Sequence, residues 1–207
     1  RGLSLGRDAA WKRTMLSVLP DLDQPLCLDL ACGTGDIASL LGARYPGGRI
    51  VAMDLVGAML KIARMRGLPG GVQLLRGDMM HLTLADACVD VVTGSYAIRN
   101  APDLGGALDE VARVLKPGGC AAFLDFSKPA GRRIQAIEFA VLKAWGSFWG
   151  LLMHGNPGVY GYIAESLKRF PDRDALRGLL AERGFRTLDP RRFFGGVVEV
   201  LWLQKEE

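Results

Sequence analysis

Apolar residues in the central part of the chain alternate between short continuous runs and helically spaced stripes. Five runs are typical of buried strands and cover 26–31, 49–54, 72–76, 89–95 and 120–126. Three stretches between them have helical periodicity and cover 36–44, 58–66 and 104–115. Near-continuous apolar strands that alternate with helices predict an α/β fold, in which a mostly parallel sheet carries helices on both faces.

Helix and strand signals also flank this core. Arg7–Leu19 has the pattern of an amphipathic helix, and a long helical stretch runs from Arg132 to about Met153. A Gly/Pro break at 155–158 then precedes two more helical segments, and 195–203 is typical of a closing strand. We expect a single domain with four parts: an N-terminal helix (1–25), a ligand-binding core (26–127), a helical lid insertion (128–172), and a closing helix and strands (173–207).

The charge of the chain is unevenly distributed. The 207 residues carry a net charge of +4; residues 1–127 hold 13 Lys+Arg and 13 Asp+Glu, whereas residues 128–207 hold 13 and 9. The first part is neutral and has no basic stripe with interleaved aromatic residues, which argues against a nucleic-acid partner. The basic excess at the end fits either a surface that meets anionic lipid or an ordinary solvated surface.

The cysteines and the distribution of apolar runs bear on the cellular compartment. Cys27, Cys32, Cys88 and Cys120 fit neither a zinc spacing nor a disulfide framework, so we expect free thiols in a reducing cytoplasm and no metal site. No apolar run reaches the roughly 18 residues of a membrane-spanning helix, and no secretory signal is recognisable. We therefore expect a cytoplasmic protein.

A glycine-rich loop follows the first predicted strand and opens the first core helix. Gly33 and Gly35 allow a tight turn there and let a ligand lie against bare backbone amides. Gly33-Thr34-Gly35 also satisfies a dinucleotide fingerprint, and Asp54, at the end of the second strand, suits a ribose in either case. This loop alone therefore leaves a nicotinamide oxidoreductase open.

Three further features favour a different cofactor. Asp29 lies four residues before Gly33, where a carboxylate suits a cationic ligand end and would repel a pyrophosphate. Gly77-Asp78 follows the third strand, where a carboxylate can accept a hydrogen bond from an adenine amino group. A Lys-Pro-Gly-Gly turn at 116–119 precedes the fifth strand. In this order the motifs resemble those of class I methyltransferases, whose cofactor S-adenosylmethionine carries a zwitterionic amino acid and a sulfonium.

This resemblance implies a fold, a cofactor site and a product. The fold is a Rossmann-like seven-stranded sheet in the order 3-2-1-4-5-7-6, with the last strand antiparallel. The product of the cofactor is S-adenosyl-L-homocysteine. The implied cofactor residues are Asp29, Ala31, Gly33, Thr34, Gly35, Asp54, Leu55, Gly77, Asp78, Met79 and Ser95.

Further motifs resemble one family within this class, the UbiE/MenG C-methyltransferases of ubiquinone and menaquinone biosynthesis. The segment 96–103 is similar to the family's F-G-[LI]-R-N-V-x-D motif, with Tyr96 in place of Phe, and 125–129 to its E-F-S-K-P, with Asp125 in place of Glu. The segment 5–13 is similar to its S-x-G-x-x-x-x-W-K-R approach helix, and 164–171 to part of its tail. The likeness extends over nearly the whole chain, although 200–203 departs from the family's final I-H-x-G.

The resemblance implies methyl transfer to a ring carbon of a reduced polyprenyl quinone, a benzoquinol or a naphthoquinol. Arg99 would stabilise the charge on the quinol oxygen, because an arginine guanidinium keeps its proton and is a poor general base. Asn100 would orient the hydroxyl, His154 is a weaker candidate for the general base, and Tyr160 is a further candidate to face the ring. A methyltransferase acting on another phenolic, polyketide or terpenoid acceptor stays open, as does a non-catalytic protein that only binds S-adenosylmethionine.

The long helix after the core carries an apolar stripe whose partner the sequence leaves open. Its members are Ile134, Ile137, Val141, Trp145, Phe148 and Leu152, at spacings of three and four. The stripe fits an ordinary core-facing helix, or a wall for an isoprenoid tail that meets the membrane surface. A peripheral membrane contact and a homodimer are the associations that we consider for the chain, besides its lipophilic quinol substrate.

Overall fold

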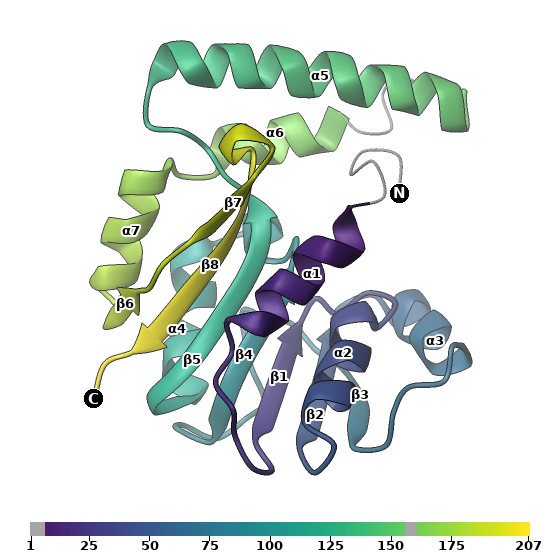
Figure 1. Ribbon diagram of the computed structural model, residues 1–207, viewed down its shortest axis with the longest axis vertical. Helices are drawn as coiled ribbons and strands as arrows, with labels where there is room; N and C mark the ends of the chain where they lie inside the picture. Colours follow the sequence, from purple (N-terminus) through teal and green to yellow (C-terminus); the bar gives the residue numbers. More distant parts are fainter. Residues whose placement is uncertain (1–6, 156–160) are drawn as a thin grey trace.

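The computed structural model describes residues 7–155 and 161–207, with only the backbone described for Arg132, Gly150, Met153, His154 and residues 161–164. Its centre is one sheet with the strand order β3-β2-β1-β4-β5-β8-β6, and β7 pairs with β8 (Figure 1). The strands are β1 (Leu26–Leu30), β2 (Arg49–Asp54), β3 (Val72–Arg76), β4 (Val89–Ser95), β5 (Leu115–Phe126), β6 (Phe185–Thr187), β7 (Arg191–Phe193) and β8 (Val198–Lys205).

Helices cover both faces of this sheet. The helices are α1 (Asp8–Ser17), α2 (Asp36–Arg44), α3 (Gly57–Met65), α4 (Leu104–Val114), α5 (Arg132–His154), α6 (Gly161–Arg169) and α7 (Arg173–Ala181), with 3-10 turns η1 (Ile98–Asn100) and η2 (Phe194–Gly196). Buried residues of α1, α2 and α3 belong to one core cluster, and those of α4, α6 and α7 to a second one. The fold thus has three layers, helices–sheet–helices (Figure 1).

The core follows from the alternation of side chains along the central strands. In β1, Cys27 faces the cluster of α1 and α2, whereas Leu28 faces the cluster of α4. In the neighbouring β4, Val91 and Val92 divide in the same way. Strands β1 to β5 are parallel, so their carboxyl ends meet at one edge. Strand β8 is antiparallel to β5 and closes the sheet.

The predicted α/β sheet is confirmed, with one strand more than expected. The segment expected as the seventh strand is β8, in its expected place beside β5, and the extra strand is the short β7 at its side. Residues 116–119 were predicted as a turn, but they lie within β5, which begins at Leu115 opposite Val89. The pairing shifts register between Val89 and Val91, so the glycines form an irregularity in the strand instead of ending the element.

The closing strand also begins later than the predicted Gly195. Gly195 and Gly196 have φ values of 64° and 102°, in the left-handed region that extended strands do not use. A Cβ on Gly196 would lie 2.7 Å from Nη2 of Arg173, which explains why the chain passes there without a side chain. The pair therefore forms the turn η2, and β8 starts at Val198.

Helix α5 turns its apolar stripe away from the protein. The six residues of the stripe are 38% to 66% exposed, whereas Phe139 and Leu142 on the other side of the helix pack against the core. Figure 1 shows α5 lying across the end of the molecule, with α6 below it. The interpretation as an ordinary core-facing helix is therefore wrong for this stripe, because the core contacts come from the opposite face of α5.

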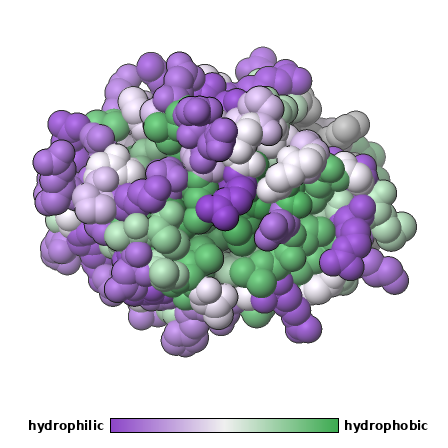
Figure 2. Space-filling model, turned by 90° about the horizontal axis from the view of Figure 1, so that it is seen from below, coloured by the Kyte–Doolittle hydropathy of each residue, from purple (hydrophilic) through white to green (hydrophobic). Residues whose placement is uncertain are grey.

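The end of the molecule opposite α5 has a different surface. Figure 2 shows apolar side chains gathered in the middle of this face, with charged and polar side chains around them. Leu22, in the segment before β1, lies at this amino-terminal edge of the sheet and is 39% exposed. Exposed apolar side chains are thus present at both ends, but the long stripe belongs to α5 alone among the described helices.

The orientation of α5 predicts a contrast in stability between its two faces. Ile137→Ser should change the free energy of unfolding by less than about 0.5 kcal/mol, because the side chain is already in solvent. Phe139→Ala should cost about 1–2 kcal/mol, because the ring packs against the core. Urea denaturation of the two variants measures both values. A loss for Ile137→Ser as large as that for Phe139→Ala would show that the stripe is covered in solution.

Candidate functional site

Asp54 holds the glycine loop to the end of β2. Its Oδ2 accepts the backbone N–H of Gly33 at 2.7 Å, and its Oδ1 accepts that of Val56 at 2.8 Å. Gly33 and Gly35 have φ values of 55° and 83°, and a Cβ on Gly33 would meet nothing within 4 Å. The loop is thus shaped by its glycines and by one carboxylate, with open space beside Gly33 for a ligand.

Asp29 is a buried carboxylate with an unused oxygen. It is 0% exposed at the end of β1, and its Oδ1 accepts the Thr93 hydroxyl at 3.0 Å. Among the described residues, its buried Oδ2 has no hydrogen-bond partner. Burial raises the pKa of Asp29 to about 7, although the Thr93 hydrogen bond, a backbone hydrogen bond from Ala38 and the charge of Lys12 act in the opposite direction. An orphaned buried oxygen beside the glycine loop fits the ammonium group of an amino-acid ligand.

The residues after β3 and β4 complete this edge. Gly77 lies so close to Met53 that a Cβ would stand 2.5 Å from the sulfur. Asp78 follows it, half-buried, and its Oδ1 accepts the N–H of Met80 at 2.9 Å. Ser95, at the end of β4, has a buried hydroxyl without a partner among the described residues. Gly77 and Asp78 follow β3 and Ser95 ends β4, so these groups lie at the carboxyl edge of the parallel strands, where open α/β sheets bind ligands.

The remaining predicted cofactor residues differ in exposure. Leu55 is 59% exposed beside Asp54, so it offers an apolar surface to a ligand. Thr34 is tied down, because both its hydroxyl and its carbonyl oxygen accept Nη1 of Arg66 at 2.9 Å. Ala31 has a positive φ of 49° at the start of the loop, and Met79 is half-buried after Asp78. Their contact with a cofactor stays a prediction.

Arg99 lies in a buried joint between η1, the end of β5 and helix α6. Its Nε donates to Oδ1 of Asp125 at 3.0 Å, its backbone N–H donates to Oδ2 at 3.1 Å, and Nη1 donates to the Ser166 hydroxyl on α6. The guanidinium stands over the Phe126 ring, with 5.1 Å between its central carbon and the ring centroid. The Arg99 side chain is 2% exposed, and that of Asp125 is 3% exposed.

This geometry favours a bracing role for Arg99. A guanidinium committed to a buried carboxylate and a hydroxyl holds η1 against β5 and α6. Burial raises the pKa of Asp125, and the charge and hydrogen bonds of Arg99 oppose that effect. The sequence analysis assigned no role to Asp125, although the similarity of 125–129 to a family motif was a signal that could have found it. A direct contact of Arg99 with substrate stays a prediction.

Asn100 and Tyr96 lie on the same loop, nearer the surface. The Asn100 side chain is exposed and donates to the carbonyl oxygen of Tyr96 at 2.8 Å. Tyr96 has a positive φ of 57°, its hydroxyl donates to Asp8 on α1 at 3.1 Å, and its ring lies 5.7 Å from that of Phe126. The Tyr96 hydroxyl therefore joins this loop to α1.

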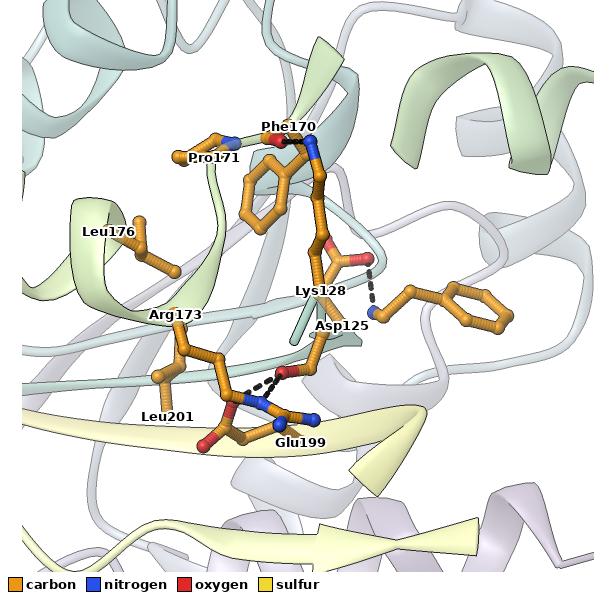
Figure 3. A pocket seen from close by; sticks show the side chains of 10 residues that line it. Asp125, Lys128, Phe170, Pro171, Arg173, Leu176, Glu199 and Leu201 are labelled. Atoms are coloured by element: carbon orange, nitrogen blue, oxygen red, sulfur yellow. Dashed lines mark hydrogen bonds and ion pairs between the residues drawn. The ribbon is translucent and has the colours of Figure 1, made fainter. Parts of the chain in front are cut away.

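A second buried polar cluster joins the end of β5 to β7, β8 and the start of α7. Glu199 accepts the Ser127 hydroxyl at 2.7 Å and Nε of Arg192 at 3.0 Å, and Arg173 donates to the Ser127 oxygen at 2.7 Å. Lys128 reaches the carbonyl oxygen of Phe170 at 2.9 Å. Figure 3 shows Arg173 and Glu199 meeting beside a cavity of about 10 Å³, the size of a single water. The cavity lies within this polar cluster and is too small for a substrate.

The other predicted catalytic residues are only partly described. Tyr160 lies outside the described residues, and of His154 only the backbone at the end of α5 is described. Glu138, which the sequence analysis did not single out, lies on the inner side of α5, and burial raises its pKa to about 7 against the charge of Arg173. The described side chains include no cluster that could hold a metal ion.

A family model matches residues 2–205 of the chain and is described as the ubiE/COQ5 methyltransferase family. The chain belongs to this family. A demethylmenaquinone methyltransferase of Thermus thermophilus is 36% identical over 187 residues, which are 89% of this chain and 85% of the relative. A ubiquinone/menaquinone biosynthesis C-methyltransferase of Xanthomonas campestris is 35% identical over 207 residues, with 96% and 80% covered. The predicted class, an S-adenosylmethionine-dependent methyltransferase, is thereby confirmed.

Solved structures show the same fold at low identity. A methyltransferase of Mesorhizobium loti matches with a TM-score of 0.69 and 17% identity, covering 99% of this chain and 100% of its own. One of Aquifex aeolicus matches with a TM-score of 0.66 and 17% identity, covering 93% and 88%. The [4+2]-cyclase SpnF also matches, with a TM-score of 0.70, 18% identity and coverage of 96% and 80%. Because one of these proteins is named a cyclase and the other two are named methyltransferases, the fold alone does not decide the reaction.

The raised pKa of Asp29 predicts a pH dependence of cofactor binding by this methyltransferase. A ligand ammonium requires the ionised carboxylate, so below about pH 7 binding must remove a proton from Asp29. The affinity for S-adenosylhomocysteine should therefore rise about tenfold per pH unit as pH increases towards 7 and then level off. Isothermal titration between pH 5.5 and 8 measures this. Asp29→Asn should remove the slope, whereas exposed Asp21→Asn should keep it; an unchanged slope in Asp29→Asn would contradict the assignment.

Proposed function

We propose that this protein methylates a ring carbon of a reduced polyprenyl quinone precursor, demethylmenaquinol or a related benzoquinol. The observation that carries the proposal is the joint of Arg99, Asp125 and Ser166, which unites three segments that resemble the quinol-methylating family. Membership of the ubiE/COQ5 methyltransferase family and the names of the relatives support the same substrate.

The reaction needs a carbon nucleophile that is aligned and dry. Loss of the proton from a quinol hydroxyl raises the electron density on the adjacent ring carbon. That carbon forms the new C–C bond while the sulfur–methyl bond breaks, and the ring then loses its proton to restore aromaticity. When bound, S-adenosylmethionine supplies the methyl group on a sulfonium and leaves as S-adenosylhomocysteine. Holding the reacting atoms in line and excluding water can supply much of the rate acceleration.

The chain would divide the work between its two polar regions. Asp29 would take the amino-acid ammonium of the cofactor, Asp54 the ribose hydroxyls, and Asp78 the adenine amino group. Asp54 already accepts two backbone N–H groups, and each carboxylate oxygen retains a lone pair for a further donor. On the acceptor side, Arg99 would hold η1 so that Asn100, exposed at its end, orients the quinol hydroxyl.

Helix α5 would meet the membrane in which a polyprenyl substrate resides. Its apolar stripe is exposed along the length of the helix, and Arg133 and Lys143 are exposed on the same helix. The helix lies over the carboxyl edge of the sheet, on the same side as the cofactor residues (Figure 1). An apolar stripe with flanking cations is typical of a helix that rests in the lipid interface. Among the described residues, no helix is long and apolar enough to cross a bilayer.

The activity test uses a quinol acceptor and a variant of the buried joint. The purified chain should methylate demethylmenaquinol in the presence of a reductant and leave the oxidised quinone unmodified. Arg99→Lys should lower turnover about a hundredfold or more and change the Kd for S-adenosylhomocysteine less than threefold, because Lys lacks the planar set of donors. The control is Arg113→Lys, because Arg113 also forms ion pairs with carboxylates, those of Glu110 and Asp86, but at the opposite edge of the sheet. Full turnover of Arg99→Lys, or activity on the oxidised quinone, would contradict the proposal.

The membrane proposal predicts binding to anionic vesicles. Sedimentation with vesicles of phosphatidylglycerol should retain the wild-type chain, and binding should weaken as salt increases. Ile137→Glu should reduce binding at least about tenfold, because one charge enters the apolar stripe. Leu22→Glu, at the opposite edge, is the matched control. Equal binding of both variants would contradict the proposal, as would sedimentation showing that the stripe joins two copies of the chain.

A further inference from the structure

Lys12 lies beside the glycine loop although it comes from the helix before the core. Its Nζ is 2.7 Å from Oδ2 of Asp8 on α1 and 2.9 Å from Oδ2 of Asp36. Asp36 is the first residue of α2 and directly follows Gly35 of the loop. The Lys12 side chain is only 12% exposed. Helix α1 therefore places a nearly buried ammonium at the amino-terminal end of α2.

The same ammonium acts on Asp29. Lys12 is close enough for its charge to lower the pKa of this carboxyl, against the larger effect of burial. Asp29 in turn keeps a buried Oδ2 without a partner among the described residues. The Lys12 ammonium and a carboxyl group with one unused oxygen thus stand near each other at the glycine loop, where a Cβ on Gly33 would meet only open space.

We propose that Lys12 binds the α-carboxylate of S-adenosylmethionine, opposite the ammonium site at Asp29. The amino-acid end of this cofactor is a zwitterion, and a site for it needs one group of each charge at close range. A lysine ammonium has three protons, of which Asp8 and Asp36 account for two, so one can point to a ligand. The start of helix α2 adds a favourable field for an anion at the same place.

Lys12 is more than a clamp between α1 and α2. Arg66 already donates to Oδ1 of Asp36 at 2.6 Å, so that carboxylate has a second cation of its own. Hydrogen bonds with Asp8 and Asp36 raise the pKa of Lys12 although burial lowers it, so the ammonium stays charged throughout the neutral range. An exposed ion pair would be enough to hold α1 against α2. The nearly buried position of Lys12 gives its charge a larger effect on a ligand.

The test compares ligands with and without the amino-acid end. In Lys12→Met, the affinity for S-adenosylhomocysteine should fall about 10- to 100-fold, the range for a lost hydrogen bond between charged groups. The affinity for 5′-methylthioadenosine, which lacks the amino-acid end, should change less than threefold. Lys12→Arg keeps the charge and should recover most of the lost affinity. Arg66→Met is the matched control, since it removes the other cation on Asp36 and should affect both ligands alike.

The proposal rests on the cofactor assignment and not on the quinol, because titration without an acceptor measures binding only. A loss of affinity for both ligands to the same degree in Lys12→Met would reduce Lys12 to a structural clamp and overturn the proposal. Unchanged affinity for S-adenosylhomocysteine would overturn it as well. If Lys12→Met does not fold, as judged by circular dichroism, Lys12→Gln provides the same comparison with a neutral polar side chain.

Discussion

A buried ion pair between Arg99 and Asp125 joins the sheet to the helices that cover its ligand edge. Burying two charges is costly, and the pair is tolerable only because further polar groups complete it. Here the Arg99 backbone, the Phe126 backbone and the Ser166 hydroxyl supply those contacts. Loss of one partner of such a pair typically costs about 3–5 kcal/mol. The positions of η1 and α6 therefore depend on the presence of both Arg99 and Asp125.

The carboxylates at the cofactor-binding edge of the sheet have different hydrogen-bond partners and therefore different roles. Asp29 and Asp54 lie near the ends of the adjacent strands β1 and β2. Asp54 accepts two backbone N–H groups with its two oxygens, whereas Asp29 accepts the Thr93 hydroxyl with Oδ1 and its Oδ2 is unpaired among the described residues. Asp54 therefore shapes the loop through hydrogen bonds accepted by both of its oxygens. Asp29 is an incomplete site in the described structure, and a cationic ligand group would complete it. The parallel order of the strands brings both to one edge, which is why residues far apart in sequence form one site.

The sequence predicted the local elements well because their signals are local. The bounds of α2, β2, β3 and β4 agree residue by residue with the apolar runs and helical spacings. The start of β5 was missed because Leu115 joins the strand by pairing with Val89, a contact that residue patterns do not encode. The outward face of α5 was left open for a similar reason: its stripe has helical spacing whether it meets a core or a membrane.

The candidate site was predictable to the extent that motifs mark it. The candidate residues at the strand ends were identified from the glycine loop and from the order in which carboxylates follow one another along the chain. Asp125 and Lys12 were quoted within motifs, but their roles depend on partners 26 and 24 residues away in sequence. Arg99 illustrates the limit in the other direction, since the motif suggested contact with substrate and the structure shows a nearly buried side chain.

The position of the transferred methyl group tests the quinol reaction most directly. The chain is incubated with S-adenosylmethionine carrying a ¹³C-labelled methyl group and with reduced demethylmenaquinol, and the product is analysed by ¹³C nuclear magnetic resonance. We expect the ¹³C-labelled methyl group to be attached to an aromatic ring carbon, because the deprotonated quinol reacts through the carbon beside its oxygen. A labelled methoxy group would show that the oxygen is the nucleophile and would contradict the reaction assigned to this site.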